Sequence, residues 1–383
     1  MKTLLVVTNG YPNKSGSNST HSFVKGSVDE LKEEYDRVDV VSPTPYYPQL
    51  LSWLDIGPDS YTSMNDFGDY TYDNVTVSYP TFFTAPTSYH RRNNARYVAN
   101  ALSDVALDDY TTALAYFCDP AGLATQRFCE TRGFDYHLVI QENSGWFEEL
   151  ADQPRVHRLW EEAKTIFRVN PGDIPRLEAY NSNSHYVPNG YHPETFYLVS
   201  QEMAREKLDL PREETILVNV ASLKTHHKNQ LNLLRGFKQI QGEHPSSLFL
   251  VGEGPDRDSV VDEMQRLSLS EKVSLVGRVP HEQVNLWMNA ADLFVLPSYH
   301  EGNPTVMFEC MATGTPQVCS RVGGVAEALS GGLLIEDPSD SSEIAQAMSK
   351  ALRTSWDEDE IIDASSKYTW GSIASTIFEK IRS

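Results

Sequence analysis

Two glutamates eight positions apart, Glu301 and Glu309, stand where carboxylates could hold a sugar or a ribose. An apolar run at 293–296 predicts a short strand before them, and an apolar stripe at 306–311 predicts a helix that opens after Pro304. A helix N-terminus presents free N–H groups that suit phosphate or sugar oxygens, and carboxylates accept hydrogen bonds from hydroxyls. Spacing alone would favour two exposed helix acids, but the strand–loop–helix context favours a binding site.

Lys228 is the second candidate for chemistry. It follows a predicted strand at 215–221 and stands at the start of a stretch, 229–240, that we expect to be helical. An ammonium in this position can meet a diphosphate as a point charge. A lone lysine is usually only solvated, but its place after a strand end favours contact with phosphate.

The stretch 298–316 resembles the Glu-x7-Glu signature of the retaining glycosyltransferase family four, whose members adopt the GT-B fold. Other stretches resemble further elements of that family: the strand ends at 251–255 and 276–280, the loop at 322–327 and the Pro-Asn-Gly element at 187–191. The resemblance covers nearly the whole chain and is stronger in the second half.

This resemblance implies roles for the site residues. Glu301 would lie near the transferred sugar and Lys228 would contact the donor phosphates, both as catalytic residues. The expected donor-binding residues are Glu309, Gly302, Asn303, Pro304, Thr305, Ser222, Gly254, Arg278 and Val279. Gly302 and Asn303 can offer backbone N–H groups, whereas Pro304 cannot. The family usually has an arginine where Ser222 stands, so Lys224 or His227 would have to complete the phosphate clamp.

The first half of the chain offers weaker candidates. Many family members carry a histidine at a strand end of the first domain, where this chain has Gln141 or Glu142. We take Glu142 as a catalytic candidate that orients donor or acceptor, with a capping or surface acid as the alternative. Gly16 is the candidate for a loop that approaches the acceptor or a phosphate.

The order of predicted elements indicates an α/β fold. Strands are expected at 3–8, 37–42, 112–117, 137–141 and 165–169, and after 188–190 again at 215–221, 248–251, 273–276, 293–296 and 317–320. Helices between them predict parallel sheets covered on both faces. We therefore expect two doubly wound Rossmann-like domains facing a central cleft: an acceptor-binding domain at 1–192 and a nucleotide-sugar-binding domain at 193–369. A last helix at 370–383 would pack back on the first domain.

The formal charge of −21, from 53 acidic and 32 basic residues, disfavours binding to nucleic acid. It resembles the surface composition of proteins from salt-loving organisms, here a halophilic archaeon, and an ordinary acidic cytosolic enzyme is the alternative. Four scattered cysteines and the lack of a long apolar run predict a cytoplasmic protein. The aromatic stretch 46–54 could touch the inner face of a membrane, although packing over the first domain is the simpler interpretation.

The sequences Asp256-Arg-Asp258 and Asp357-Glu-Asp359 mimic a metal-binding Asp-x-Asp motif, but neither follows a strand end in the required way, and Asp256 only opens a helix after Pro255. We therefore expect no metal and no cofactor. The sequence predicts a retaining, hexosyltransferase-type glycosyltransferase of glycan biosynthesis or protein glycosylation. It would move a sugar from a nucleotide diphosphate donor to a saccharide or lipid-linked saccharide. The alternatives are a nucleotide-sugar epimerase, a phosphorolytic enzyme, or a non-catalytic two-domain sugar-binding protein.

Overall fold

The computed structural model describes residues 2–15, 21–46, 67–83, 88–106 and 109–383. Gly16 and the stretch 47–54 lie outside these ranges. The chain forms two compact units: the first comprises Met1–Pro188 and Trp370–Ser383, and the second comprises Asn189–Thr369. Each unit is built around its own parallel sheet.

The first unit holds an eight-stranded sheet in the order β10-β9-β8-β7-β1-β2-β5-β4. All neighbours are parallel except β4 and β5. The strands are β1 (Thr3–Thr8), β2 (Arg37–Val41), β4 (Tyr70–Tyr72), β5 (Val75–Ser78), β7 (Thr112–Tyr116), β8 (Tyr136–Ile140), β9 (Thr165–Arg168) and β10 (Ser184–Tyr186). A separate parallel pair joins β3 (Thr44–Tyr46) to β6 (Thr81–Phe83).

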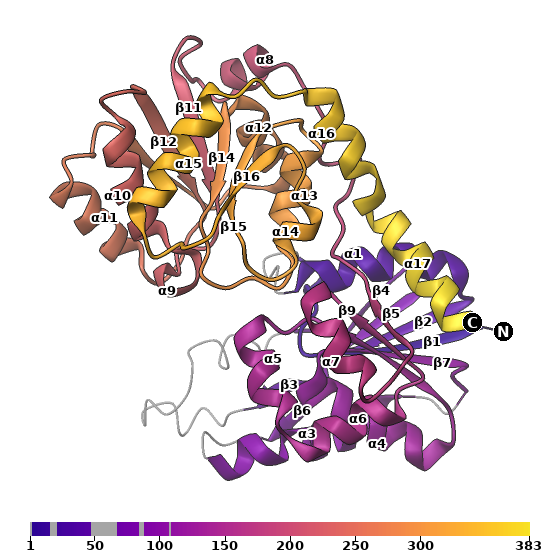
Figure 1. Cartoon of the computed structure of the whole chain (residues 1–383). Coiled ribbons are helices and arrows are strands. Elements are labelled where there is room, and N and C mark those ends of the chain that lie inside the picture. The colour runs from indigo at the N-terminus through magenta and orange to yellow at the C-terminus, as the bar shows by residue number, and fades with distance from the viewer. Residues whose placement is uncertain (1, 16–20, 47–66, 84–87, 107–108) are drawn as a thin grey trace. The chain divides into compact units, whose positions relative to one another are not determined.

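Helices cover both faces of this sheet, because alternate residues of the buried strands point to opposite sides. Leu5 and Val7 of β1 belong to one core, with α3 (Ser88–Val105), α4 (Leu123–Arg132), α5 (Ser144–Ala151), α6 (Pro154–Glu162) and α7 (Ile174–Glu178). Leu4 and Val6 belong to the other core, with α1 (Ser22–Leu31) and the final helix α17 (Trp370–Arg382). Figure 1 shows α17 lying along α1. The last helix thus belongs to the first unit.

The second unit has a six-stranded, wholly parallel sheet in the order β13-β12-β11-β14-β15-β16. Its strands are β11 (Thr215–Val220), β12 (Ser246–Val251), β13 (Val273–Gly277), β14 (Leu293–Leu296), β15 (Gln317–Ser320) and β16 (Gly332–Ile335). Its helices are α8 (Gln201–Lys207), α9 (Thr225–Lys228), α10 (Gln230–Ile240), α11 (Arg257–Arg266), α12 (His281–Ala290), α13 (Thr305–Met311), α14 (Val325–Ala328), α15 (Ser341–Arg353) and α16 (Glu358–Ser365).

The two faces of the second sheet are also both covered. Leu217, Leu293 and Val295 pack with residues of α10, α11 and α15 on one side. Phe294 and Leu296 pack with residues of α12, α13 and α16 on the other. Each predicted strand is confirmed within two residues, and the predicted helix after Pro304 is confirmed as α13. Within the described ranges, every helix is too short or too polar to span a lipid bilayer.

Candidate active site

The sheet of the second unit brings its loops together at the edge where the parallel strands end. The chain runs outward from β11 to β12 and β13 on one side, and from β14 to β15 and β16 on the other. The topological switch point therefore lies between β11 and β14. In open α/β sheets the loops leaving two such strands diverge, and ligands bind in the crevice between them at the carboxyl ends.

The two central candidates meet across this switch point. Lys228 comes from the loop region after β11 and Glu301 from the loop after β14, and Lys228 Nζ lies 2.5 Å from Glu301 Oε1. Glu301 is only 9% exposed. A carboxylate that is largely removed from water is costly unless a cation or hydrogen-bond donors compensate for it. The ammonium group of Lys228 compensates the charge of Glu301, and this ion pair holds both side chains at the carboxyl ends of the strands.

Hydrogen bonds from two asparagine side chains connect β11 and the segment after it to β14 and the segment after it. Asn229 has a left-handed backbone (φ 59°) and its Nδ2 donates to the carbonyl of Pro297 at 2.9 Å. Asn219 Nδ2 donates to the carbonyl of Val295 at 2.8 Å. The backbone N–H of Tyr299 donates to the carbonyl of His227 at 2.8 Å. The turn at Asn229 also corrects the expected helix 229–240: Lys228 is the last residue of α9, and α10 begins at Gln230.

Glu309 lies within α13 and is 8% exposed. Burial raises the pKa of its carboxyl group from 4.5 to about 8. In the free protein this side chain is thus held in its neutral form around neutral pH. Sequence spacing placed Glu309 on the helix, but it could not show that the residue faces inward.

Glycines allow the loops to approach one another. A side chain at Gly252 would lie 2.1 Å from the carbonyl oxygen of Ala221, and one at Gly254 would lie 2.3 Å from that of Leu223. Gly323 has a φ of 57°, and a Cβ there would clash with the carbonyl oxygens of Glu301 and Gly302. Gly324 N–H donates to the Gly302 carbonyl at 2.8 Å. The loop that carries Glu301 is therefore backed by the turn after β15.

Asn303 makes a contact that sequence reasoning missed. Its Oδ1 accepts from the backbone N–H of Asn189 at 3.1 Å, and its carbonyl accepts from Asn189 Nδ2 at 2.7 Å. Asn303 Nδ2 is buried and lacks a hydrogen-bond partner among the described residues. The Pro188-Asn189-Gly190 element was a visible signal, but its pairing with a residue 114 positions away was not.

The remaining predicted donor-binding residues surround the same strand ends. Ser222 is exposed after β11 and its carbonyl accepts from Gln230 Nε2 at 2.9 Å. Arg278 is exposed and Val279 half-buried after β13, while Pro304 is buried and Thr305 half-buried at the start of α13.

Two alternatives for the phosphate clamp lie beside Lys228. Lys224 is exposed, and His227 is half-buried. The ring of His227 lies 4.3 Å from that of His226 and 5.7 Å from that of His300, measured between centroids. Burial, followed by these two imidazoles and the neighbouring lysines, lowers the pKa of His227. Lys224 and Lys228 therefore supply the cationic groups on this side of the switch point, whereas His227 is shifted toward its neutral form.

Glu142 occupies a different environment, in the first unit. It is 2% exposed, and its Oε1 accepts from the backbone N–H of Cys118 at 2.6 Å. Arg168 Nη1 donates to the Glu142 carbonyl at 2.6 Å. Burial raises the pKa of the Glu142 carboxyl group. The observed function of this carboxyl group is to hold the turn that begins at Cys118, and contact with a donor or acceptor stays a prediction.

The first aspartate of each Asp-x-Asp sequence accepts hydrogen bonds from nearby backbone N–H groups. Asp256 Oδ2 accepts from both the N–H and the hydroxyl of Thr225, at 2.7 and 2.9 Å, which lowers the pKa of Asp256. Asp357 caps α16 by accepting from the N–H of Glu360 at 3.1 Å. In the part of the chain that the structure describes, no cluster of three or more histidine, cysteine or acidic side chains could hold a metal ion.

Comparison with solved structures supports the predicted fold class. The chain superposes over its whole length on sucrose-phosphate synthase from Thermosynechococcus elongatus, with a TM-score of 0.75, 19% identity and 98% of that chain covered. It also superposes on Anabaena Alr3699/HepE in complex with UDP-glucose, with a TM-score of 0.74, 16% identity and full coverage of both chains. The GT-B fold class is thus confirmed.

The match to a protein-family model lies within the second unit. Residues 200–368 match the family model described as "Glycosyl transferases group 1". The chain is 33% identical over 174 residues to the putative teichuronic acid biosynthesis glycosyltransferase TuaC of Bacillus subtilis, an alignment that covers 44% of this chain. It is 27% identical over 308 residues to mannosylfructose-phosphate synthase of Agrobacterium fabrum, covering 70% of this chain and 67% of that protein.

The first two curated relatives are matched over less than half of their length, since the alignments span 38% of TuaC and 45% of an uncharacterised glycosyltransferase of Methanocaldococcus jannaschii. The matched region nevertheless contains Lys228, Glu301 and Glu309 together with all the strand ends that surround them. Residues 200–368 of this GT-B chain are therefore similar to a glycosyl transferases group 1 domain.

Proposed function

We propose that this protein is a retaining glycosyltransferase that transfers a sugar from a nucleotide diphosphate donor to a saccharide or lipid-linked saccharide acceptor. The observation that carries the proposal is the Lys228–Glu301 pair at the switch point of the second sheet. A buried carboxylate and a cation at the carboxyl ends of parallel strands suit a ligand with hydroxyls on one part and phosphates on another. The solved relatives that bind UDP or UDP-glucose make uridine nucleotides the first donors to test.

In this proposal Lys228 contacts the diphosphate and stabilises the charge that develops as the bond to the sugar breaks. Lys224 flanks it and adds to the positive field where the family arginine is replaced by Ser222. The neighbouring His227, whose pKa is lowered, would act as a neutral imidazole that can donate a hydrogen bond to phosphate. Glu301 lies beside the transferred sugar, and the unpaired Nδ2 of Asn303 is available to donate to it. Gly302, Gly254, Arg278 and Val279 border the donor. The acceptor attacks on the face that the leaving phosphate vacates, which gives retention.

Glu309 would bind the ribose hydroxyls. As a neutral acid it can donate one hydrogen bond and accept another, and as a carboxylate it can only accept. Its burial disfavours the charged form, so its proton is retained until the pH approaches 8.

The first prediction separates the two acids. Glu309→Gln replaces the carboxyl hydroxyl, which can both donate and accept, with an amide nitrogen that only donates. Because the lost acceptor acts equally on bound donor and transition state, the donor KM should rise more than kcat falls. Glu301→Gln should lower kcat by about 10²-fold, the usual size of an electrostatic contribution beside the reacting bond, and leave donor binding near normal. Steady-state kinetics of the two variants measures these effects. The control is Glu282→Gln, which changes an exposed acid of α12. Full kcat in Glu301→Gln would remove Glu301 from catalysis.

The second prediction concerns metal. Asp256 and Asp357 are engaged by backbone donors, and in this proposal Lys228 takes the role of a metal at the phosphates. Transfer should therefore persist when EDTA is added to the assay. If EDTA abolished activity and manganese or magnesium restored it, the prediction would be wrong, and Asp256 and Asp258 would become candidate metal ligands.

The third prediction follows from the pKa of Glu309. The folded state keeps the proton up to about pH 8, whereas the unfolded chain loses it near pH 4.5. The free energy of unfolding should therefore fall as the pH rises through this interval. Glu309→Gln cannot ionise, so relative to wild type it should gain stability across the interval, by at most about 5 kcal/mol.

Urea unfolding at a series of pH values measures this difference, with Glu282→Gln as the control. A difference between Glu309→Gln and wild type that stays constant from pH 4.5 to 8 would show that the carboxyl group ionises freely in the folded protein.

A further inference from the structure

The first unit has a cavity at its own topological switch point. Its sheet runs from β1 to β2 on one side and continues from β7 to β8 on the other, so the switch lies between β1 and β7. A cavity of about 520 Å³ opens there, bordered by Thr8 at the end of β1, Asn9 after it, Pro43 after β2, and Asp119 and Pro120 after β7. Small-molecule sites span roughly 300–1,000 Å³, so this volume suits a ligand of a few sugar units at most.

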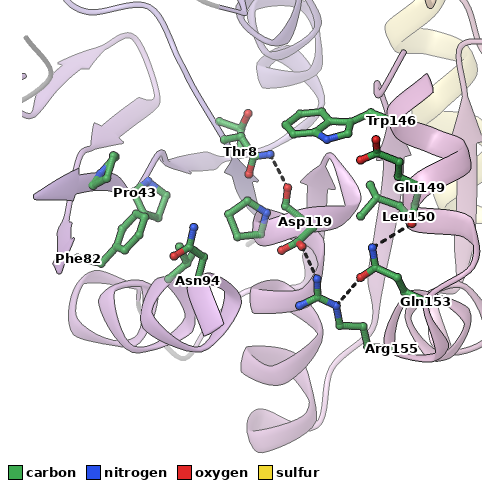
Figure 2. A pocket seen from close by; sticks show the side chains of 14 residues that line it. Thr8, Pro43, Phe82, Asn94, Asp119, Trp146, Glu149, Leu150, Gln153 and Arg155 are labelled. Carbon is green, nitrogen blue, oxygen red and sulfur yellow. Dashed lines mark hydrogen bonds and ion pairs between the residues drawn. The ribbon is translucent and has the colours of Figure 1, made fainter. Parts of the chain in front are cut away.

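One wall of the cavity is polar and connected. Asp119 Oδ2 lies 2.8 Å from Arg155 Nη2, Arg155 Nε donates to Gln153 Oε1 at 2.9 Å, and Gln153 Nε2 donates to the Glu149 carbonyl at 3.0 Å. Figure 2 shows this chain of contacts beneath the cavity. Burial raises the pKa of the Asp119 carboxyl group, and Arg155 opposes that rise. The Arg155 guanidinium is thus already engaged by groups of the wall.

The turn that carries Asp119 is fixed from behind. Asn9 Nδ2 donates to the Asp119 carbonyl at 3.0 Å, and Asn9 Oδ1 accepts from the N–H of Ala121 at 3.1 Å. Glu142 holds the neighbouring N–H of Cys118 at 2.6 Å. A carboxylate on such a braced turn is pre-organised to receive hydrogen bonds.

The same side of the cavity also carries an aromatic ring and a second acid. Trp146 and Glu149 lie three positions apart on α5 and so share a face of that helix. Trp146 is 56% exposed although its indole borders the cavity. In Figure 2 Trp146, Glu149 and Leu150 lie on one side and Phe82 and Pro43 on the other, with Asp119 between them. An exposed indole face suits the C–H face of a sugar ring.

We propose that this cavity binds a neutral, hydroxyl-rich saccharide unit and discriminates against phosphorylated and uronate sugars. Carboxylate oxygens accept hydrogen bonds from sugar hydroxyls, whereas an anion would face two acids and one cation that is already paired. That the bound saccharide is the acceptor of the transfer rests on the proposed function. The binding chemistry itself rests on Asp119, Glu149 and Trp146.

Calorimetric titration of the full chain without a donor tests the proposal directly. The probes are glucose, mannose and galactose, each paired with its 6-phosphate. At least one neutral sugar should bind, and its phosphate should bind about 10-fold more weakly or worse. Trp146→Ala should weaken the neutral sugar by about 10-fold, the size of one lost stacking contact. Glu149→Lys should reverse part of the discrimination by improving the affinity for the phosphate.

Tyr197→Ala is the matched control, because Tyr197 is an aromatic side chain of the second unit that is exposed to 51% and does not line this cavity. The proposal is overturned if no neutral sugar of the panel binds. It also fails if a phosphate binds more tightly than its neutral partner to wild type, or if Trp146→Ala behaves like Tyr197→Ala. These outcomes are independent of transfer, which is followed separately as nucleotide release from the donor. Absence of release with saccharide binding intact would refute the proposed function alone.

Discussion

The ion pair between Lys228 and Glu301 is the interaction on which the candidate active site depends. It joins the loops that follow two parallel strands, β11 and β14, and that lead to opposite sides of the sheet. The pair forms only because β11 and β14 are neighbours in the sheet. A largely buried carboxylate without this partner would destabilise the loop. The surrounding asparagines and glycines allow the loops to come this close, since Asn229 bridges to Pro297 and Gly323 admits the backbone of Glu301.

Both units place polar side chains at a switch point, but they differ in charge. In the second unit Lys228 and Lys224 outnumber Glu301, which favours phosphates. In the first unit Asp119 and Glu149 outnumber Arg155, which favours hydroxyls. Because the two switch points carry opposite charge, the second unit would select a nucleotide sugar and the first unit a neutral saccharide. The same sheet geometry thus supports two different ligand chemistries.

The central strands could be predicted from the sequence because each is an apolar run bounded by turn residues. The three-residue strands β3, β4, β6 and β10 could not, since so few residues carry no periodicity. The Glu301 and Lys228 positions were found through their motif context, whereas the contact between them required the sheet order. The neutral state of Glu309 depends on burial by distant segments, which no local pattern shows.

The wall of the first-unit cavity was missed for a related reason. Asn143 before Trp146 was a visible N-cap signal, and its Oδ1 does accept from the Trp146 N–H at 3.0 Å. The pairing of Asp119 with Arg155, however, joins residues 36 positions apart on different elements. Glu142 was recognised as a strand-end acid, but only the structure shows that it braces the turn at Cys118.

The central claim is that Lys228 holds the diphosphate of a nucleotide sugar at the switch point of the second sheet. Thermal-shift titration with UDP-glucose and other nucleotide diphosphate sugars measures this, because a donor that binds the folded state raises its unfolding temperature. At least one donor should stabilise wild type and the control Lys238→Met, an exposed lysine of α10, equally, and should bind Lys228→Met at least about 10-fold more weakly. Circular dichroism confirms that each variant is folded. Equal stabilisation of all three proteins by the same donor would contradict the account.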